Sequence, residues 1–189
     1  MSRVRRSFDV LMALGSLLVL APFLLLIALL IKLTSRGPFL YWSNRIGVQN
    51  TVFSMPKFRT MRTDTPVVAT HLLTDPDRYL TPVGGFLRKF SLDELPQLVA
   101  ILKGDITFVG PRPALYNQRD LIAQRTGKGV HTLVPGLTGW AQINGRDNLT
   151  IPAKVGFDEY YMHHRSVPLD LKIALLTILK VVRRDGVTH

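Results

Sequence analysis

Residues 10–31 read VLMALGSLLVLAPFLLLIALLI, and this stretch holds no charged side chain. At about 1.5 Å per residue, a straight helix of this length would cover the ~30 Å hydrocarbon core of a bilayer. A cleaved secretory signal is the alternative, but the apolar run is longer than a signal core and no small-residue cleavage site precedes the polar chain. The stretch therefore predicts a membrane anchor, and the arrangement of the remaining residues depends on it.

Two features of the anchor bear on whether it crosses the membrane. Pro22 lies near its middle, where a proline removes a backbone hydrogen bond and bends or breaks a helix. Both flanks are basic, and positive charge marks the cytoplasmic side of a membrane. The flanking cations are Arg3, Arg5 and Arg6 before the stretch and Lys32, Arg36 and Arg45 after it. We therefore predict a re-entrant anchor over residues 1–36, which keeps both clusters in the cytoplasm, rather than a membrane span.

The charge balance of the chain limits its partners. Lys and Arg total 24 while Asp and Glu total 13, which gives a formal net charge of +11. Such an excess suits nucleic acid, anionic lipid or a phosphorylated substrate, without choosing among them. The sequence has no cysteine, which excludes disulfide frameworks, thiolate zinc sites and cysteine nucleophiles.

After the anchor, the sequence predicts one compact α/β domain over residues 37–189. Residues 36–61 are typical of short strands and turns, and residues 63–82 of a polar loop. Residues 84–103 favour a helix with a break near Ser91. The other expected elements are a helix ending at Gly127 or Gly129, a Gly-rich loop or hairpin over 134–150, and helices over 151–166 and 167–186.

The last of these segments is amphipathic. Its apolar face is broad, while Asp170, Thr177 and Arg184 recur every seven residues on the other side. With its lysines and arginines, the pattern suits a helix that lies in the plane of the lipid headgroups. A helix that turns its apolar face to the protein core explains the pattern equally well.

Asp93 and Glu94 stand side by side in SLDELPQL, residues 91–98, just before an apolar run. Ser91 and Glu94 fit the S-x-x-E capping box, in which both carboxylates only stabilise a helix start. Pro96 favours a start nearer Asp93, since proline is tolerated in the first helical turn. There, free amides can hold an anionic phosphate beside a carboxylate nucleophile. The local sequence leaves capping and chemistry open.

Several cations are candidates for the same site. Arg112 stands between two prolines that fix its backbone, and a guanidinium binds phosphate through two hydrogen bonds. Lys57 and Arg59 would point to one face of a strand, and Arg88 precedes the acids. A rigid surface turn and a charge-guarded edge strand are the alternative roles. Cations that converge on an acid pair indicate a phosphoryl-transfer site with Mg²⁺. Asp158 is expected on a helix surface or in packing.

Three motifs resemble those of bacterial monotopic phosphoglycosyl transferases, the bacterial sugar transferase family. They are KFRTM at residues 57–61, FLRKFSLDELPQLVAILKGDITFVGPRP at 86–113 and VPGLTGWAQINGR at 134–146. The resemblance covers nearly the whole chain and implies a re-entrant helix that anchors an α/β catalytic domain. It also implies transfer of a sugar 1-phosphate from a UDP-sugar to polyprenyl (undecaprenyl) phosphate, with release of UMP and a requirement for Mg²⁺.

The resemblance also implies roles for individual residues. Asp93 corresponds to the nucleophile that forms a covalent phosphosugar intermediate and to the carboxylate that contacts the metal. Glu94 corresponds to its acidic partner, either a base or an orienting group. The positions expected near the substrate are Lys57, Arg59, Arg88, Arg112 and Arg146.

On this interpretation the chain starts a glycan at the cytoplasmic face of the bacterial inner membrane. Its expected partners are membrane lipid, a UDP-sugar donor and the polyprenyl phosphate acceptor, but no nucleic acid. The identity of the sugar and homo-oligomerisation stay open. A rival interpretation is a membrane-tethered basic nucleic-acid-binding or scaffold protein, which accounts for the charge and the anchor alone. It predicts salt-sensitive binding and no effect of Asp93→Asn.

Overall fold

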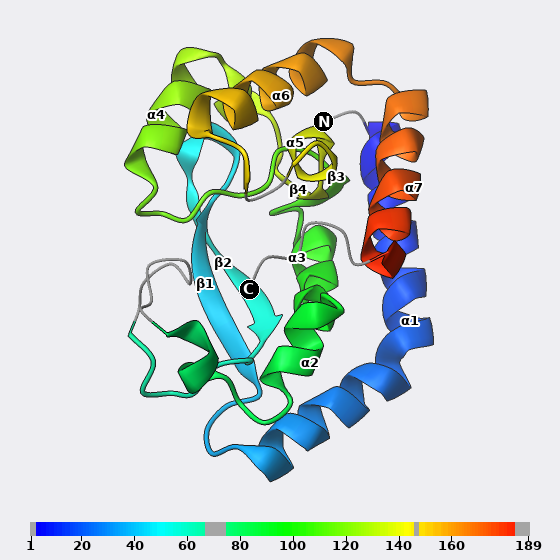
Figure 1. Ribbon diagram of the computed structural model, residues 1–189. Helices are drawn as coiled ribbons and strands as arrows, with labels where there is room; N and C mark the ends of the chain where they lie inside the picture. The colour runs from blue at the N-terminus through cyan, green and yellow to red at the C-terminus, as the bar shows by residue number, and fades with distance from the viewer. Residues whose placement is uncertain (1–2, 67–74, 146–147, 184–189) are drawn as a thin grey trace.

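The computed structural model describes residues 3–66, 75–145 and 148–183. Its N-terminal residues form one long helix, α1 (Arg3–Thr34), with Pro22 inside it. Figure 1 shows that α1 changes direction about midway along its length. A bend is expected at a proline, which removes one helix hydrogen bond. By length and composition, α1 is long and apolar enough to reach across a bilayer.

Two antiparallel strands follow α1, and the second strand ends within the KFRTM motif. β1 (Leu40–Ile46) pairs with β2 (Val52–Phe58), and the connection contains a short 3₁₀ turn, η1 (Val48–Asn50). Aromatic and β-branched residues in both segments suit the pleated conformation. The strands predicted within residues 36–61 are therefore confirmed.

The helical stretch predicted over residues 84–103 is divided into three elements. They are α2 (Gly84–Lys89), a 3₁₀ turn named η4 (Leu92–Glu94) and α3 (Gln97–Lys103). The break falls at Ser91 as predicted, because its φ of 54° is left-handed and ends the helical path. A further 3₁₀ turn, η3 (Pro76–Tyr79), precedes α2.

A short parallel pair of strands joins the second motif to the third. β3 (Thr107–Val109) pairs with β4 (Gly136–Thr138), and α5 (Trp140–Ile143) follows directly. The hairpin alternative for residues 134–150 is wrong, because β4 takes a partner that is distant in the sequence.

Close backbone contact explains the glycines of this region. A Cβ atom at Gly136 would lie 2.1 Å from the backbone nitrogen of Gly110, and one at Gly139 would lie 2.1 Å from the Gly110 carbonyl oxygen. The amide of Gly110 donates to Thr138 O at 2.8 Å, and that of Gly136 donates to Pro111 O at 2.9 Å. The Gly-rich motif is thereby held against the Pro-Arg-Pro motif.

The remaining helices follow the sequence prediction. α4 (Arg119–Gly127) ends at the predicted glycine, and a 3₁₀ turn, η5 (Val130–Thr132), leads back to β4. α6 (Ile151–His164) begins after Thr150, whose hydroxyl caps the helix. α7 (Val167–Arg183) closes the described chain and runs beside α1 in Figure 1.

Both interpretations of the amphipathic segment fit part of α7. Ile173 is fully buried in a core shared with Val109 and Tyr161. Leu171 and Ile178, in contrast, are each about 60% exposed. One side of α7 therefore packs on the protein while apolar side chains remain on the other, and its place in a lipid interface stays a prediction.

One side of α1 packs along the same protein body. The residues that pack recur three or four positions apart, as on one helix face: Ala13, Leu17, Leu20, Leu24, Ile27 and Ile31. Exposed leucines and a valine lie elsewhere around the helix: Leu11, Leu18, Val19, Leu25 and Leu33. The chain is thus a mixed helix and strand protein with an apolar N-terminal helix, as predicted, whereas the division at residue 36 and the re-entrant path stay predictions.

Candidate functional site

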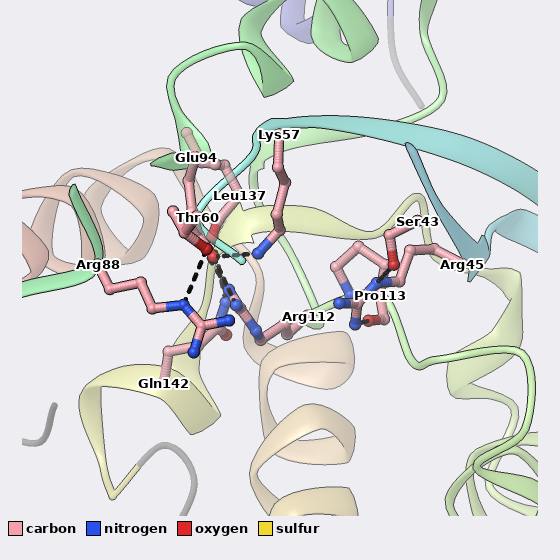
Figure 2. A network of polar contacts seen from close by, with 10 residues as sticks. All are labelled: Ser43, Arg45, Lys57, Thr60, Arg88, Glu94, Arg112, Pro113, Leu137 and Gln142. Carbon is pink, nitrogen blue, oxygen red and sulfur yellow. Dashed lines mark hydrogen bonds and ion pairs between the residues drawn. The ribbon is translucent and has the colours of Figure 1, made fainter. Parts of the chain in front are cut away.

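Glu94 lies between two cations from different parts of the chain. Lys57 Nζ in β2 is 2.9 Å from Glu94 Oε1, and Arg112 Nη2 is 2.7 Å from the same oxygen. The Arg112 Nη1 group also reaches Oε2 at 3.5 Å. Figure 2 shows these side chains meeting with Arg88 and Thr60 from separate segments. Three of the predicted site residues are therefore brought together.

Asp93 differs from its neighbour although both lie in η4. Among the described residues its carboxylate accepts no hydrogen bond and forms no ion pair. Burial raises the pKa of Asp93, against the opposing charges of Lys57 and Arg88. The Asp93 carboxylate thus lies near cations but forms no hydrogen bond or ion pair with them in the described residues. Its oxygens can therefore act as a nucleophile or as metal ligands.

Glu94 shows the opposite electrostatic behaviour. Burial alone would raise its pKa, but the charges and hydrogen bonds of Arg112 and Lys57 hold that pKa well below its usual range. The ionised form of Glu94 is therefore favoured, and its carboxylate binds two cations. This favours an orienting role over that of a general base, which must take up a proton near neutral pH.

The capping-box interpretation of these acids is wrong. The Ser91 side chain makes no capping hydrogen bond, and the Glu94 side chain points to Lys57 and Arg112 instead of back to Ser91. The regular helix α3 starts only at Gln97, with Pro96 as its N-cap residue. Asp93 lies in the first turn of the short 3₁₀ element η4, ahead of α3 and not at the start of α3 itself.

Arg88 enters the site from α2. Its Nε donates to the Thr60 hydroxyl at 2.9 Å, and burial lowers the pKa of its guanidinium, against the charge of Asp93. A cation held by one neutral hydroxyl keeps other N–H groups for a ligand. Thr60 was not a candidate in the sequence, although it belongs to the KFRTM motif.

Arg59 is not brought into this cluster, and its hydrogen bonds favour a structural role over the predicted substrate contact. Strand β2 ends at Phe58, so Arg59 leaves the alternation that would have placed it beside Lys57. Its guanidinium donates to the carbonyls of Pro38 at 2.6 Å and Arg36 at 2.7 Å, and to the Ser35 hydroxyl at 2.8 Å. Arg59 is only 5% exposed and holds the chain just after α1.

Two further positions complete the comparison with the sequence prediction. Arg146 lies outside the described residues, so its role stays a prediction. Gln142 was not a candidate, yet Figure 2 places it near Arg88 and Arg112. Its Oε1 is buried without a hydrogen-bond partner in the described part of the chain. A buried acceptor of this kind is suited to a ligand hydroxyl or amide.

The acidic residues of the described chain also bear on metal binding. No group of three or more His, Asp or Glu residues lies close enough together to form a metal cage in the described ranges. Mg²⁺ does not need such a cage, because it keeps several waters and commonly binds one or two carboxylates together with substrate phosphates. The uncommitted carboxylate of Asp93 fits this kind of site.

Comparisons with known proteins agree with the motifs. The family described as bacterial sugar transferase matches residues 1–184. The uncharacterized sugar transferase EpsL of Bacillus subtilis (strain 168) is 39% identical over 184 residues, which cover 97% of this chain and 90% of that protein. The chain therefore belongs to the bacterial sugar transferase family.

Two relatives carry more specific names. The undecaprenyl-phosphate glucose phosphotransferase of Komagataeibacter xylinus is 40% identical over 191 residues, covering 94% of this chain and 36% of the relative. The UDP-glucose:undecaprenyl-phosphate glucose-1-phosphate transferase of Escherichia coli (strain K12) is 39% identical over 184 residues, covering 94% and 40%. The chain spans less than half of these two proteins.

Proposed function

We propose that this chain is a sugar-1-phosphate transferase that uses a UDP-sugar as donor and undecaprenyl phosphate as acceptor, and that Asp93 is its nucleophile. The observation that carries the proposal is the difference between the neighbouring carboxylates of Asp93 and Glu94. Glu94 is fixed by two cations, while Asp93 lies beside them without a hydrogen bond in the described residues. The names of the two related glucose phosphotransferases supply the reaction class.

The charge of the site suits a diphosphate. Lys57, Arg88 and Arg112 supply three positive charges, and Asp93 and Glu94 supply two negative ones. The excess positive charge lies in a partly buried site, where electrostatic attraction is stronger than in bulk water. Arg112, with 27% of its side chain exposed, can contact solvent and therefore a ligand. A nucleotide sugar presents matching negative charge at its two phosphates.

The proposed reaction consists of two displacements at one phosphorus atom. An Asp93 carboxylate oxygen attacks the β-phosphorus of the UDP-sugar, and the bond from that phosphorus to the bridging oxygen breaks. UMP leaves with the bridging oxygen. An oxygen of the lipid phosphate then attacks the same phosphorus, and the bond to Asp93 breaks, which returns the carboxylate and yields a sugar on a lipid diphosphate.

Mg²⁺ belongs to this proposal as a bound cofactor. Asp93 would hold it together with the donor phosphates, since its oxygens are not taken up by described neighbours. When bound, the ion neutralises negative charge that develops on the transferred and leaving phosphates. The chain's own contribution is to hold Lys57 and Arg112 in place through Glu94 and to present the Asp93 oxygen.

The lipid acceptor requires a membrane site, and the docking of α1 supports a re-entrant path. Near its start, Arg6 donates to the carbonyls of Ile101 at 2.5 Å and Leu102 at 2.6 Å, at the end of α3. Asp9 is 2% exposed and accepts a hydrogen bond from Thr107 Oγ1 at 2.7 Å.

The other end of α1 is docked on the same body. Ile31 is fully buried in a core with Phe58 and Leu87. A helix that crossed the bilayer would have to release one of these ends, whereas a helix that dips into one leaflet keeps both. The exposed leucines of α1 and α7 would then face lipid at the cytoplasmic side of the inner membrane.

The path of α1 can be tested by labelling. A cysteine introduced by Arg3→Cys is expected to react with a membrane-impermeant maleimide only after the cytoplasmic face of the membrane is opened. The absence of native cysteines keeps the label specific. Labelling from the periplasmic side of intact cells would show a membrane span and overturn the re-entrant path.

The reaction itself is tested by UMP release. Purified wild-type protein is mixed with Mg²⁺, undecaprenyl phosphate and one of several donors, beginning with UDP-glucose and including UDP-N-acetylhexosamines. We expect release with a subset of donors and none from Asp93→Asn. Asp120→Asn, a matched change at an exposed acid in the first turn of α4, should keep full activity.

The rival nucleic-acid or scaffold interpretation makes a different prediction in the same assay. It predicts no UMP release from any donor, and equal properties of wild type and Asp93→Asn. Salt-sensitive binding of DNA that is unchanged by Asp93→Asn would then support it.

A further inference from the structure

A second arginine–carboxylate pair lies behind the Pro-Arg-Pro motif. Arg125 in α4 donates to one oxygen of Asp158 in α6 through Nε at 3.0 Å and Nη2 at 2.6 Å. The Arg125 side chain is 9% exposed and the Asp158 side chain 1%. No ligand from solvent can readily approach such a pair, and the proposed reaction does not use it.

The third nitrogen of the Arg125 guanidinium contacts the backbone of Arg112. Its Nη1 donates to the backbone carbonyl of Arg112 at 2.8 Å. Arg112 is flanked by Pro111 and Pro113, which have no N–H to donate. The Pro-Arg-Pro segment therefore depends heavily on hydrogen bonds that its carbonyl oxygens accept.

The other carbonyls of the segment are held by different elements. Gly136 N in β4 donates to Pro111 O at 2.9 Å. Arg45 Nη1 in β1 donates to Pro113 O at 3.2 Å. Figure 2 shows Arg112 between this Arg45–Pro113 contact and the Glu94 cluster. Arg125 adds the bond at Arg112 itself, the residue whose guanidinium must be aimed.

We propose that Arg125, oriented by Asp158, is a positioning residue that fixes the backbone of Arg112 and so directs its guanidinium to Glu94 and to the donor phosphates. The part about the donor rests on the proposed function, while the backbone anchoring does not. The pair acts through Arg112 and does not touch the substrate.

A purely structural role would not require a charged pair here. Burial of two charges is costly, and well-packed apolar residues of similar volume commonly replace a buried ion pair without loss of stability. An apolar pair, however, cannot donate to the Arg112 carbonyl. The double variant Arg125→Met/Asp158→Leu therefore separates folding from positioning, because it leaves no unpaired buried charge.

The first test measures the backbone directly. Hydrogen–deuterium exchange is followed in peptides that cover residues 111–118 of the full-length, detergent-solubilised protein. We expect faster exchange in the double variant than in wild type, with little change in α2 or α3. Unchanged exchange in residues 111–118 would overturn the proposal whatever the protein's activity.

The second test is a cycle with Arg112. In the wild-type background, the double variant should lower kcat/KM for the donor by roughly tenfold to hundredfold, the size expected when a binding group is displaced by about 1 Å. In an Arg112→Ala background, the same change should have less than about a twofold effect, because the residue it positions is gone. Equal losses in both backgrounds would indicate a general structural defect and contradict the proposal.

Two control variants are available: one changes a neighbouring exposed ion pair between the end of α4 and α6, and the other changes Arg125 itself. Lys128, the C-cap residue of α4, has its Nζ 3.3 Å from Oε1 of Glu159 in α6, and the two side chains are 57% and 31% exposed. Lys128→Met/Glu159→Gln should leave exchange and kcat/KM unchanged. Arg125→Lys keeps a positive charge beside Asp158 but loses the planar guanidinium that donates to the Arg112 carbonyl. Compared with wild type, this variant should therefore lose less thermal stability than kcat/KM.

The two proposals fail in different ways. Wild-type protein that releases no UMP with any donor would contradict the proposed function and leave the exchange test to decide the anchoring of Arg112. Active wild-type protein with an unaltered double variant would contradict the role of Arg125 alone.

Discussion

Two arginine–carboxylate pairs meet at Arg112, one through its backbone carbonyl and one through its guanidinium. Arg125 and Asp158 are closed to solvent, with side chains 9% and 1% exposed. Arg112 and Glu94 are more open, at 27% and 14%, and Glu94 also binds Lys57. The same chemical pair therefore occurs once as an internal clamp and once as part of an accessible, positively charged cluster.

The difference shows that pairing alone does not define a functional site. In the closed pair, two guanidinium nitrogens of Arg125 donate to one oxygen of Asp158, and the third donates to a backbone carbonyl. The open pair leaves Arg112 partly exposed beside a carboxylate, Asp93, that no described residue hydrogen-bonds. The site that can bind a phosphate is distinguished by the partial exposure of Arg112 and by the neighbouring Asp93 carboxylate, which has no hydrogen bond in the described residues.

The largest expected effect is on Asp93. Asp93→Asn should reduce sugar-phosphate transfer on the order of 10³-fold or more, as loss of a nucleophile does. Thermal unfolding should change little, because Asp93 makes no described hydrogen bond. Activity within tenfold of wild type in a coupled UMP assay would show that Asp93 is not the nucleophile.

Removal of divalent metal should have an effect nearly as large. Treatment with EDTA should abolish UMP release, and added Mg²⁺ should restore it, since Asp93 and the donor phosphates would hold the ion that neutralises the phosphate charge. The melting temperature without donor should stay unchanged, because the described chain has no group of three acidic or histidine ligands that a structural ion would need. Full activity in EDTA would contradict a metal requirement.

The two pairs should separate activity from stability. Arg112→Met should reduce kcat/KM strongly but lower the free energy of unfolding by less than Asp158→Asn does, since Lys57 still pairs with Glu94. Asp158→Asn should lower stability by roughly 3–5 kcal/mol, because it leaves the Arg125 charge buried without its partner. Chemical denaturation with parallel activity measurements checks both, and a reversed pattern would break the comparison.

A third arginine sharpens the same distinction. Arg59→Met should lower stability by roughly 1.5–3 kcal/mol, because charged hydrogen bonds to the carbonyls after α1 are lost. The KM for the donor should not change. Arg62→Met removes a nearby exposed arginine paired with Asp64 and should change stability by less than about 1 kcal/mol. A raised donor KM in Arg59→Met would return Arg59 to the substrate site.

The smallest effect is a shift in pH dependence. Asp93 must be ionised to attack, and burial raises its pKa, so activity should fall at a higher pH than for an exposed aspartate. Lys57 opposes this rise in pKa. Lys57→Met should therefore move the acid limb of the pH–rate profile to higher pH at saturating Mg²⁺, whereas Lys128→Met should not. An acid limb that stays in place or moves to lower pH in Lys57→Met would contradict this electrostatic account.

The sequence predicted the elements well where the signal was local. The apolar helix, the break at Ser91 and the end of α4 at Gly127 follow from hydrophobic pattern, turn position and glycine content. Of the loop and the hairpin that the sequence allowed around β4, the hairpin was wrong, because the partner β3 is distant in the chain and no local pattern encodes that pairing.

The site was predictable in part for the same reason. The motifs indicated Lys57, Arg88, Glu94 and Arg112, but the direction of Arg59 depends on strand β2 ending at Phe58 and on the position of the end of α1. Local spacing does not encode such tertiary facts. Arg125 and Asp158 likewise lie on separate helices, and only the fold brings them together.

Detection of the covalent intermediate tests the central claim most directly. Wild-type protein is incubated with Mg²⁺ and an active UDP-sugar, without the lipid acceptor, and is examined by intact mass spectrometry and peptide mapping. The proposal predicts a mass increase of one sugar phosphate on the peptide that contains Asp93, with loss of the adduct when undecaprenyl phosphate is added. Efficient product formation without any adduct on rapid quenching, or the same adduct in Asp93→Asn, would contradict it.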